Sequence, residues 1–178
     1  MTVLSRPFLV VALLALLLSG CGASTAHNDA DVAFASGMVP HHRQAVQMSD
    51  TLLAKPGIDG DVTALASRIK AEQAPEIEQM RGWLSAWGAG VETNDGGGMG
   101  GMDDGMMSAE EMNALGEADG RTAQTLYLQG MVRHHRGAVA MAQTEVAQGE
   151  NADAKALAQS IITSQQAEID QMNQLLAR

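Results

Sequence analysis

The chain contains long segments in which apolar residues recur every three or four positions, separated by short segments without this period. In the first such segment the stripe consists of Phe34, Met38, His41, Ala45, Met48 and Leu52. This spacing predicts an amphipathic helix over about residues 29–54. Lys55-Pro56-Gly57 follows it and predicts its end.

Three further segments show the same period. The second predicted helix opens after residues 59–61 and extends to Trp87, and the last two extend over about residues 121–148 and 152–176. Residues 92–107 combine Gly, Asp and Met without any period, which predicts a linker. Ser108 to Glu111 then form a capping box, which predicts a short helix to about residue 118.

A twelve-residue segment occurs twice. Residues 37–48 read GMVPHHRQAVQM and residues 130–141 read GMVRHHRGAVAM, so nine of twelve positions are identical at a separation of 93. A second match, at a separation of 92, relates residues 65–84 to 157–176. Each unit is a helical hairpin that cannot bury its apolar face alone. Two of them predict an all-α four-helix bundle with a pseudo-twofold axis, joined by a Gly/Met-rich crossover.

The expected organisation follows from this duplication. The bundle covers residues 29–178, with repeat one at 29–90, the linker and short helix at 91–118, and repeat two at 119–178. Residues 1–20 carry Arg6 and then an apolar run too short to span a membrane comfortably, which indicates a signal peptide. Leu18 to Cys21 read LSGC and fit a bacterial lipobox.

The lipobox predicts where the protein resides. We expect Cys21 to carry lipid and to anchor the chain to a membrane, with residues 21–28 as a tether in which His27 is exposed. The protein is then a lipoprotein of the bacterial cell envelope on the extracytoplasmic side. Because Cys21 is the only cysteine, disulfides within the chain and thiolate metal sites are excluded.

Charge and composition restrict the kinds of partner and the fold class that we expect. With 21 acidic and 11 basic residues the formal net charge is −10, which argues against nucleic-acid binding and is compatible with cations. Aromatic residues make up only 3%, which argues against a β fold. The sequence leaves open whether the chain forms a homo-oligomer.

The histidines are the first candidates for metal ligands, because the repeats hold four of the five histidines. These are His41 and His42 in the first copy and His134 and His135 in the second. Neutral imidazole is the commonest metal ligand in proteins. Adjacent side chains on a helix point about 100° apart, so a His pair is not expected to chelate one ion by itself. Met38, three and four residues before the first pair, offers a more natural Met-His couple.

Glu76 and Glu168 lie within apolar stripes, where an unpaired carboxylate costs on the order of several kcal/mol. One interpretation is a metal site in each copy, built from Met38, His41, His42, Glu76 and Met80 and from Met131, His134, His135, Glu168 and Met172. The other is a buried polar layer in which the histidines bond to Glu76, Glu168, Gln73 and Gln165 and fix the helix register.

The linker methionines form a second candidate site. Met99, Met102, Met106 and Met107 lie in a glycine-rich loop, where a methionine has no core to fill. They are then either exposed without a role or soft thioether ligands, which favour Cu(I).

Several segments resemble the domain of unknown function 305 family: GMVPHHRQAVQM, AEQAPEIEQM, GMMSAEEMNAL, GMVRHHRGAVAM and SQQAEIDQM. The resemblance extends from about Asp31 to the C-terminus. It implies a ferritin-like fold and the handling of copper or a related metal in the bacterial envelope. Family members often carry an Asp about ten residues before the His pair. Asp31 matches it, whereas Gln124 holds this place in the second copy, which implies that the two copies are not fully equivalent.

Three function classes follow. The first is a lipoprotein that binds copper, or another transition metal, for sequestration or transfer in the envelope. The second is a structural or partner-binding envelope protein in which the His/Glu layer only sets the fold. The third, a ferritin-like dinuclear enzyme, usually needs Glu-x-x-His motifs. Because this motif does not occur in the sequence, we expect no enzyme activity.

Overall fold

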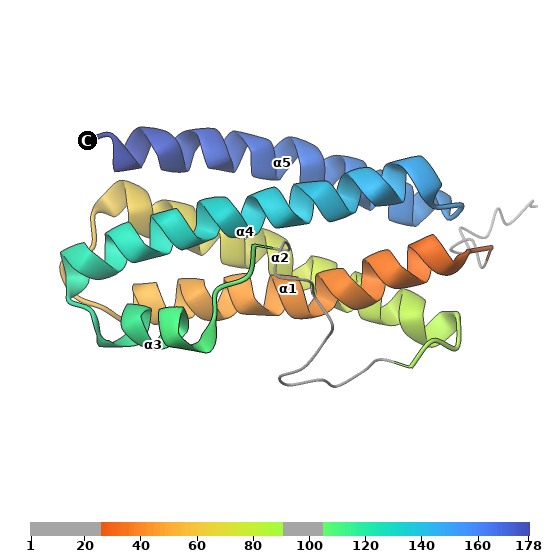
Figure 1. Ribbon diagram of the computed structural model, residues 1–178, viewed down its shortest axis with the longest axis horizontal. Helices are drawn as coiled ribbons and strands as arrows, with labels where there is room; N and C mark the ends of the chain where they lie inside the picture. Colours follow the sequence, from red (N-terminus) through yellow and green to blue (C-terminus); the bar gives the residue numbers. More distant parts are fainter. Residues whose placement is uncertain (1–25, 91–104) are drawn as a thin grey trace, which may run out of the picture.

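The computed structural model describes residues 26–90 and 105–178 of the chain. The helices are α1 (Asp29–Leu53), α2 (Gly60–Ala86), α3 (Ala109–Glu117), α4 (Gly120–Gln148) and α5 (Ala152–Leu176), and the described residues contain no strand (Figure 1). The predicted all-α bundle is therefore confirmed, with boundaries within one or two residues of those expected. The predicted signal peptide, Cys21, Met99 and Met102 lie outside the described residues.

Each helix starts at a residue whose side chain accepts a hydrogen bond from the first turn. Asn28 and Ser108 form capping boxes with residues 31 and 111, and Asp59, Asp119 and Asn151 cap the remaining helices. Such caps satisfy backbone N–H groups that have no partner within the helix. None of the helices in the described ranges is long and apolar enough to cross a membrane.

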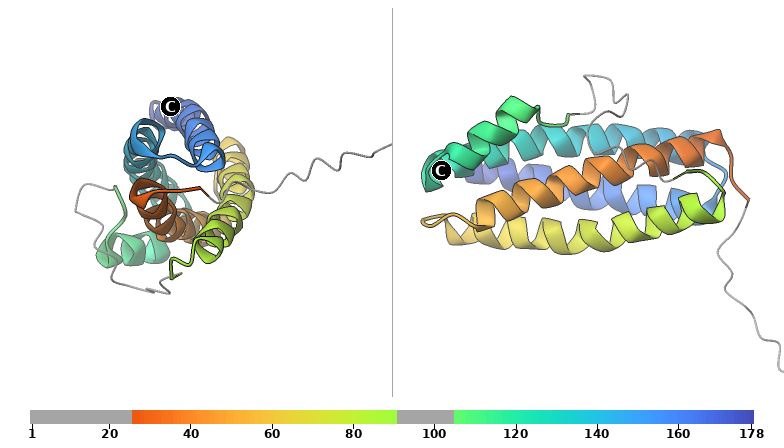
Figure 2. Two further views of the ribbon diagram at one scale, coloured as in Figure 1. Left: turned by 90° about the vertical axis from the view of Figure 1, so that its right-hand side faces the viewer. Right: turned by 90° about the horizontal axis from the view of Figure 1, so that it is seen from below.

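The four long helices form two hairpins that pack face to face. Helices α1 and α2 form the first hairpin, α4 and α5 form the second, and α1 packs against α4 between them (Figure 1). Figure 1 shows α1 antiparallel to α4 and α2 antiparallel to α5, as expected for a twofold axis perpendicular to the bundle. The seam between α2 and α5 is the least tightly packed side. The short α3 lies outside the bundle against α1 and α4 (Figure 2).

Two separate apolar cores stabilise the bundle. The Tyr127 core fills one end, with buried residues such as Leu52, Leu65, Tyr127, Met131 and Met172. The Trp83 core fills the other, with Met38, Met80, Trp83, Ala138 and Ile161 among its buried residues. On every long helix the middle turn lies between the residues of the two cores. This middle turn carries the histidines and glutamates.

The segment before α1 is held against the bundle. His27 stacks on Trp87 with ring centroids 4.9 Å apart, so the expectation of an exposed tether histidine is wrong. The carbonyl of Ala26 accepts a hydrogen bond from the Asn151 side chain. The physical reason is that an aromatic ring at the end of α2 offers His27 an apolar surface to stack on.

Candidate metal centre

A layer of polar side chains, all buried except the half-buried Glu76, separates the two cores. It contains His41, His42, Gln73, Glu76, His134, His135, Gln165 and Glu168, which come from all four long helices. The four histidines are at most 1% exposed. Both sequence interpretations named the histidines and glutamates, and the polar-layer interpretation also named Gln73 and Gln165. We refer to these eight residues as the His layer.

In each hairpin the second histidine of the pair bonds to a glutamate of the following helix. His42 Nε2 lies 2.8 Å from Glu76 Oε2, and His135 Nε2 lies 2.8 Å from Glu168 Oε2. The two bonds are related by the pseudo-twofold axis. The predicted pairing of each core carboxylate with a histidine is therefore found twice.

The first histidines of the two pairs meet at the axis. The rings of His41 and His134 have centroids 3.7 Å apart with a tilt of 38°. Within one pair the rings diverge, since the centroids of His41 and His42 are 6.4 Å apart. Each pair therefore sends one ring to its own glutamate and the other to the opposite hairpin.

The surroundings favour neutral imidazole. Burial lowers the pKa of His134 well below its usual value, and the neighbouring His41, His135 and His42 lower it further. Burial also lowers the pKa of His135, although its hydrogen bond with Glu168 opposes this. Neutral rings carry a lone pair, which is the form that binds a metal ion.

Several buried polar atoms of the His layer lack a hydrogen-bond partner within the described residues. These atoms include Nδ1 of His42, Nδ1 of His135, both ring nitrogens of His134, both side-chain polar atoms of Gln73, Oε1 of Gln165 and Oε1 of Glu168. Buried polar atoms normally have a partner, because leaving one unsatisfied costs about 1–3 kcal/mol. In His42 and His135 the glutamate holds Nε2, so the atom left over is the second ring nitrogen.

Four buried methionines border the His layer, two on each side. Met38 and Met80 belong to the Trp83 core, while Met131 and Met172 belong to the Tyr127 core, and none of the four is exposed. Met38 and Met131 lie one helical turn before His42 and His135, on the same helix face. Thioether sulfurs therefore come close to the layer along α1 and α4, as the Met-His spacing predicted.

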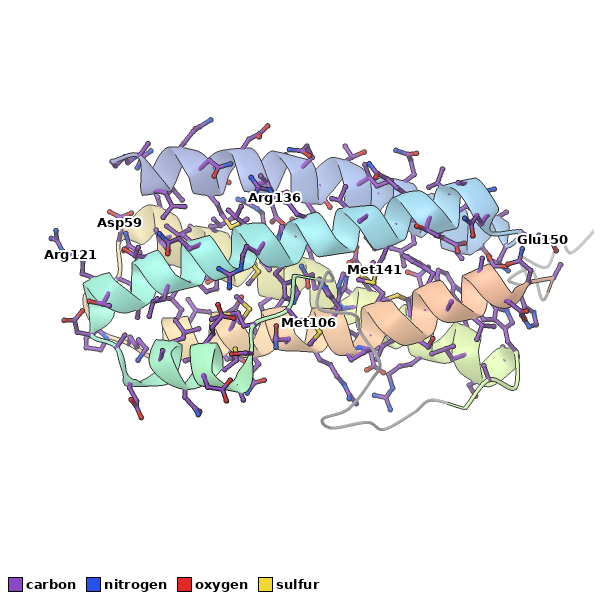
Figure 3. All side chains as sticks on the ribbon, viewed as in Figure 1. Asp59, Met106, Arg121, Arg136, Met141 and Glu150 are labelled. Carbon is purple, nitrogen blue, oxygen red and sulfur yellow. The ribbon has the colours of Figure 1, made fainter. Side chains whose placement is uncertain are left out.

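The end of the linker lies across α1 and α4 and forms a strap, residues 105–108. The Gln44 side chain donates to the Met107 carbonyl oxygen at 2.8 Å and accepts from the Met107 backbone N–H at 2.7 Å. Met107 is only 6% exposed and belongs to the Tyr127 core. The expectation that it has no core to fill is therefore wrong. Met106 is half-buried beside it, and Figure 3 places it near the middle of the bundle.

Two glycines let this strap approach closely. Gly105 has a φ of +76°, and a Cβ atom there would lie 2.1 Å from the Arg133 carbonyl oxygen. A Cβ atom on Gly130 would lie 2.8 Å from the Met107 sulfur. The strap thus depends on glycine both at its own start and on the helix surface beneath it.

Asp31 lies at the end of the bundle, away from the His layer. Its carboxylate accepts from the backbone N–H of Asn151 at 2.9 Å and of Glu150 at 3.2 Å, in the loop of the opposite hairpin. In the second copy Gln124 accepts in the same way from the backbone N–H of Asp59 at 3.1 Å. The Asp31/Gln124 difference therefore concerns how each hairpin holds the other's loop.

Glu145 is a buried acid that the sequence analysis missed. It is 1% exposed and lies beside Asp31, because a Cβ atom on Gly149 would be within 2.8 Å of both carboxyl groups. Burial, and then the neighbouring Asp31, raise the pKa of Glu145 to about 8. The sequence does contain a signal for the burial of Glu145, because the repeat places it where the first copy has the apolar Leu52.

Within the described residues, no group of three or more His, Cys, Asp or Glu side chains is arranged to hold a metal ion. Any metal in the His layer would need other donors beside the nitrogen atoms. Uncharged donors are present in the buried methionines at the border of the layer and in Gln73 within it.

Known structures resemble this one over most of its length. A DUF305 protein from Streptomyces coelicolor, named as a candidate secreted protein, is 39% identical, with a TM-score of 0.76 over 83% of this chain and 92% of that chain. A DUF305 fragment from Deinococcus radiodurans is 28% identical, with a TM-score of 0.77 over 85% and 97%. None of the curated proteins matches the chain significantly.

A third similar protein is CopM. Its Cu(II)-bound form is 29% identical to this chain, with a TM-score of 0.71 over 83% of this chain and 95% of CopM. Structures of CopM with Cu(I) and with Ag bound are similar as well. The model of the family described as "Domain of unknown function (DUF305)" matches residues 31–176. The chain therefore belongs to the DUF305 family.

Proposed function

We propose that this protein binds copper in the His layer and holds it as cargo in the bacterial envelope, for sequestration or transfer. The observation that carries the proposal is the pair of buried Nδ1 atoms, on His42 and His135, that have no hydrogen-bond partner among the described residues. A metal ion would be their missing partner.

The glutamates would hold the histidines for this task. A metal-binding histidine usually donates its second ring N–H to a carboxylate, which fixes the ring and makes the free nitrogen a better ligand. His42 with Glu76 and His135 with Glu168 have this arrangement. We therefore assign Glu76 and Glu168 as partners of the ligands. The first interpretation of the sequence, in which Glu76 and Glu168 bind the metal directly, would leave the histidine nitrogens without their orienting bond.

The nearby sulfurs favour copper over harder ions. Met38 and Met131 lie one turn from His42 and His135, and Met80 and Met172 are buried at the same borders. Neutral imidazole and thioether donors suit Cu(I) and Ag(I), whereas Mg²⁺ and Ca²⁺ prefer oxygen. The similarity to CopM, whose structures hold Cu(I), Cu(II) and Ag, also supports copper as the bound metal.

The envelope location and lipid anchor rest on the N-terminal sequence. The apolar run before Cys21 and the lipobox support export and membrane attachment. The candidate secreted DUF305 protein of Streptomyces coelicolor supports an extracytoplasmic location. The absence of Glu-x-x-His motifs from the sequence supports a binding protein rather than a dinuclear enzyme.

Copper binding can be tested on protein purified without a histidine tag. We expect the parent protein to compete with a chelator for Cu(I), and the His42→Leu/His135→Leu double variant to lose at least tenfold in affinity. His27→Leu is the matched control, because it removes the one histidine that lies outside the layer. Parent protein that holds no copper, or equal affinity in all three proteins, would contradict the proposal.

A purely structural layer is the second candidate. The two His–Glu hydrogen bonds support it, since each already pairs a buried carboxylate with a donor. Under this alternative the His42→Leu/Glu76→Leu double variant should fold well, because a buried polar pair can often be replaced by apolar residues at little cost. Unchanged copper affinity together with unchanged thermal stability in this variant would favour the structural role.

A further inference from the structure

The two His–Glu pairs are related by the pseudo-twofold axis, but their charged surroundings differ. On α2, Arg68 places its Nε 3.6 Å from Oε1 of Glu168, across the seam with α5. It also donates to Oε1 of Gln171 at 2.5 Å. Glu168 thus has a histidine on one oxygen and a guanidinium near the other.

The counterpart of Arg68 carries no charge. At the repeat separation of 92, residue 160 holds the place of Arg68 and is a serine, while Glu76 holds the place of Glu168. The pseudo-twofold axis therefore puts Ser160 opposite Glu76, where Arg68 stands opposite Glu168. In the first half of the layer no residue equivalent to Arg68 offsets the carboxylate.

The side chain of Glu76, which lacks an arginine partner of this kind among the described residues, is also more exposed than that of Glu168. The Glu76 side chain is 19% exposed and the Glu168 side chain 6%. A surface pocket of about 270 Å³ opens in the seam between α2 and α5, with Arg68, Glu72, Ser164 and Glu168 in its wall. In this wall Arg68 Nε lies 3.6 Å from the Glu168 carboxylate and 3.9 Å from that of Glu72, so it is nearer to Glu168.

We propose that Arg68 makes the two halves of the His layer unequal and directs the first metal cation to the His42–Glu76 half. This inference rests on the proposed copper binding and adds an order of filling to it. The physical basis is the repulsion between the Arg68 guanidinium and a cation bound at His135, the hydrogen-bond partner of Glu168. Because arginine stays protonated at every relevant pH, the bias does not depend on pH. Arg68 is a positioning residue and not a ligand.

Ag(I) is a suitable probe, because it is diamagnetic and keeps one oxidation state. With isotope-labelled histidine, NMR can follow the rings of His42 and His135 separately during an Ag(I) titration. We expect His42 to respond first in the parent, with about two- to fivefold higher affinity than His135, the effect of one partly exposed ion pair.

Two variants break this order in defined ways. Arg68→Ser gives the second half the residue of the first, so both histidines should respond together. Arg68→Ser/Ser160→Arg moves the positive charge to the other half at constant net charge, so His135 should respond first. Arg81→Ser is the matched control: it is a similarly exposed arginine on α2, bonded to Glu78, and should leave the parent order unchanged.

The outcomes separate the two proposals. If the parent binds no Ag(I) and neither histidine shifts, copper binding itself fails. If the parent binds Ag(I) but the double exchange leaves the order of His42 and His135 as in the parent, the role of Arg68 is overturned while binding stands. A thermal unfolding curve for each variant shows that the titrated protein is folded.

Discussion

In both hairpins a histidine of the repeated segment bonds to the glutamate of the next helix at the same 2.8 Å. Towards the two ends of the bundle, equivalent positions of the two hairpins hold different residues. Tyr127 holds the place of Phe34, Glu145 that of Leu52, and Gln124 that of Asp31. The middle of the bundle is thus built twice in the same way, while the ends differ in packing and charge. The His layer lies in the part that is duplicated, and the variants below test the positions at which the two copies differ.

The largest effect is expected where the copies differ in buried charge. Glu145 lies beside Asp31, and the repeat offers the apolar Leu52 at the same position. Burial first, and then Asp31, raise the pKa of Glu145 from 4.5 to about 8. A raised carboxyl pKa stabilises the folded state fully below the unfolded pKa, and the contribution is lost as the pH rises through the folded value.

We therefore expect the free energy of unfolding of the parent to fall as the pH rises from about 4.5 to about 8. Glu145→Gln, which stays neutral, should remove most of this slope, and chemical denaturation at a series of pH values measures it. Burial acts to raise the pKa of Asp31, but hydrogen bonds from the backbone N–H groups of Asn28 and Asn151 lower it overall, so the contribution of Asp31 to stability is lost only as the pH falls through the lowered value. A slope that is the same in parent and variant would contradict the assignment.

Among the described residues the strap lies on one side of the axis only, and Gly105 is its most constrained residue. An alanine there would combine a positive φ with a contact of 2.1 Å to the Arg133 carbonyl oxygen. We expect Gly105→Ala to release the strap and with it the burial of Met107, at a cost of about 2 kcal/mol. Gly116→Ala, whose Cβ atom would meet open space, is the control. Equal melting temperatures for the two variants would show that the strap does not stabilise the bundle.

The hydroxyl of Tyr127 gives a third comparison. It lies 3.0 Å from the Ser49 hydroxyl, and the equivalent positions hold Phe34 in the first copy and Ala142 in the second. Tyr127→Phe leaves Ser49 buried without its partner and should cost about 1 kcal/mol. The Tyr127→Phe/Ser49→Ala double variant restores the apolar pairing and should recover most of the loss. A double-mutant cycle with no coupling would mean that this hydrogen bond contributes nothing.

Helices and their pairing were predictable because their signals are local or repeated. The period of apolar residues fixed α1, α2, α4 and α5, and the capping box at Ser108 fixed α3. The duplication predicted two hairpins, and the lone carboxylates Glu76 and Glu168 predicted partners among the histidines. Each of these inferences uses residues at known separations along a helix or between copies.

Contacts between distant segments were not predictable in the same way. The clamp of Gln44 on Met107 joins residues 63 positions apart, and neither residue carries a signal for the other. The stack of His27 on Trp87 joins the tether to the end of α2. Glu145 was missed although its mismatch with Leu52 was visible, because a single glutamate near a helix end is usually exposed.

The smallest effect concerns two equivalent glycines, Gly37 on α1 and Gly130 on α4. A Cβ atom on Gly37 would lie 3.6 Å from the Met141 sulfur, an ordinary contact, whereas on Gly130 it would lie 2.8 Å from the Met107 sulfur. Alanine favours a helix over glycine by up to about 1 kcal/mol, so Gly37→Ala should stabilise the protein. In Gly130→Ala the displacement of Met107 should cancel this gain. Thermal unfolding of both variants measures the difference, and a gain of equal size at both positions would show that Met107 yields freely and that the strap rests only loosely on α4.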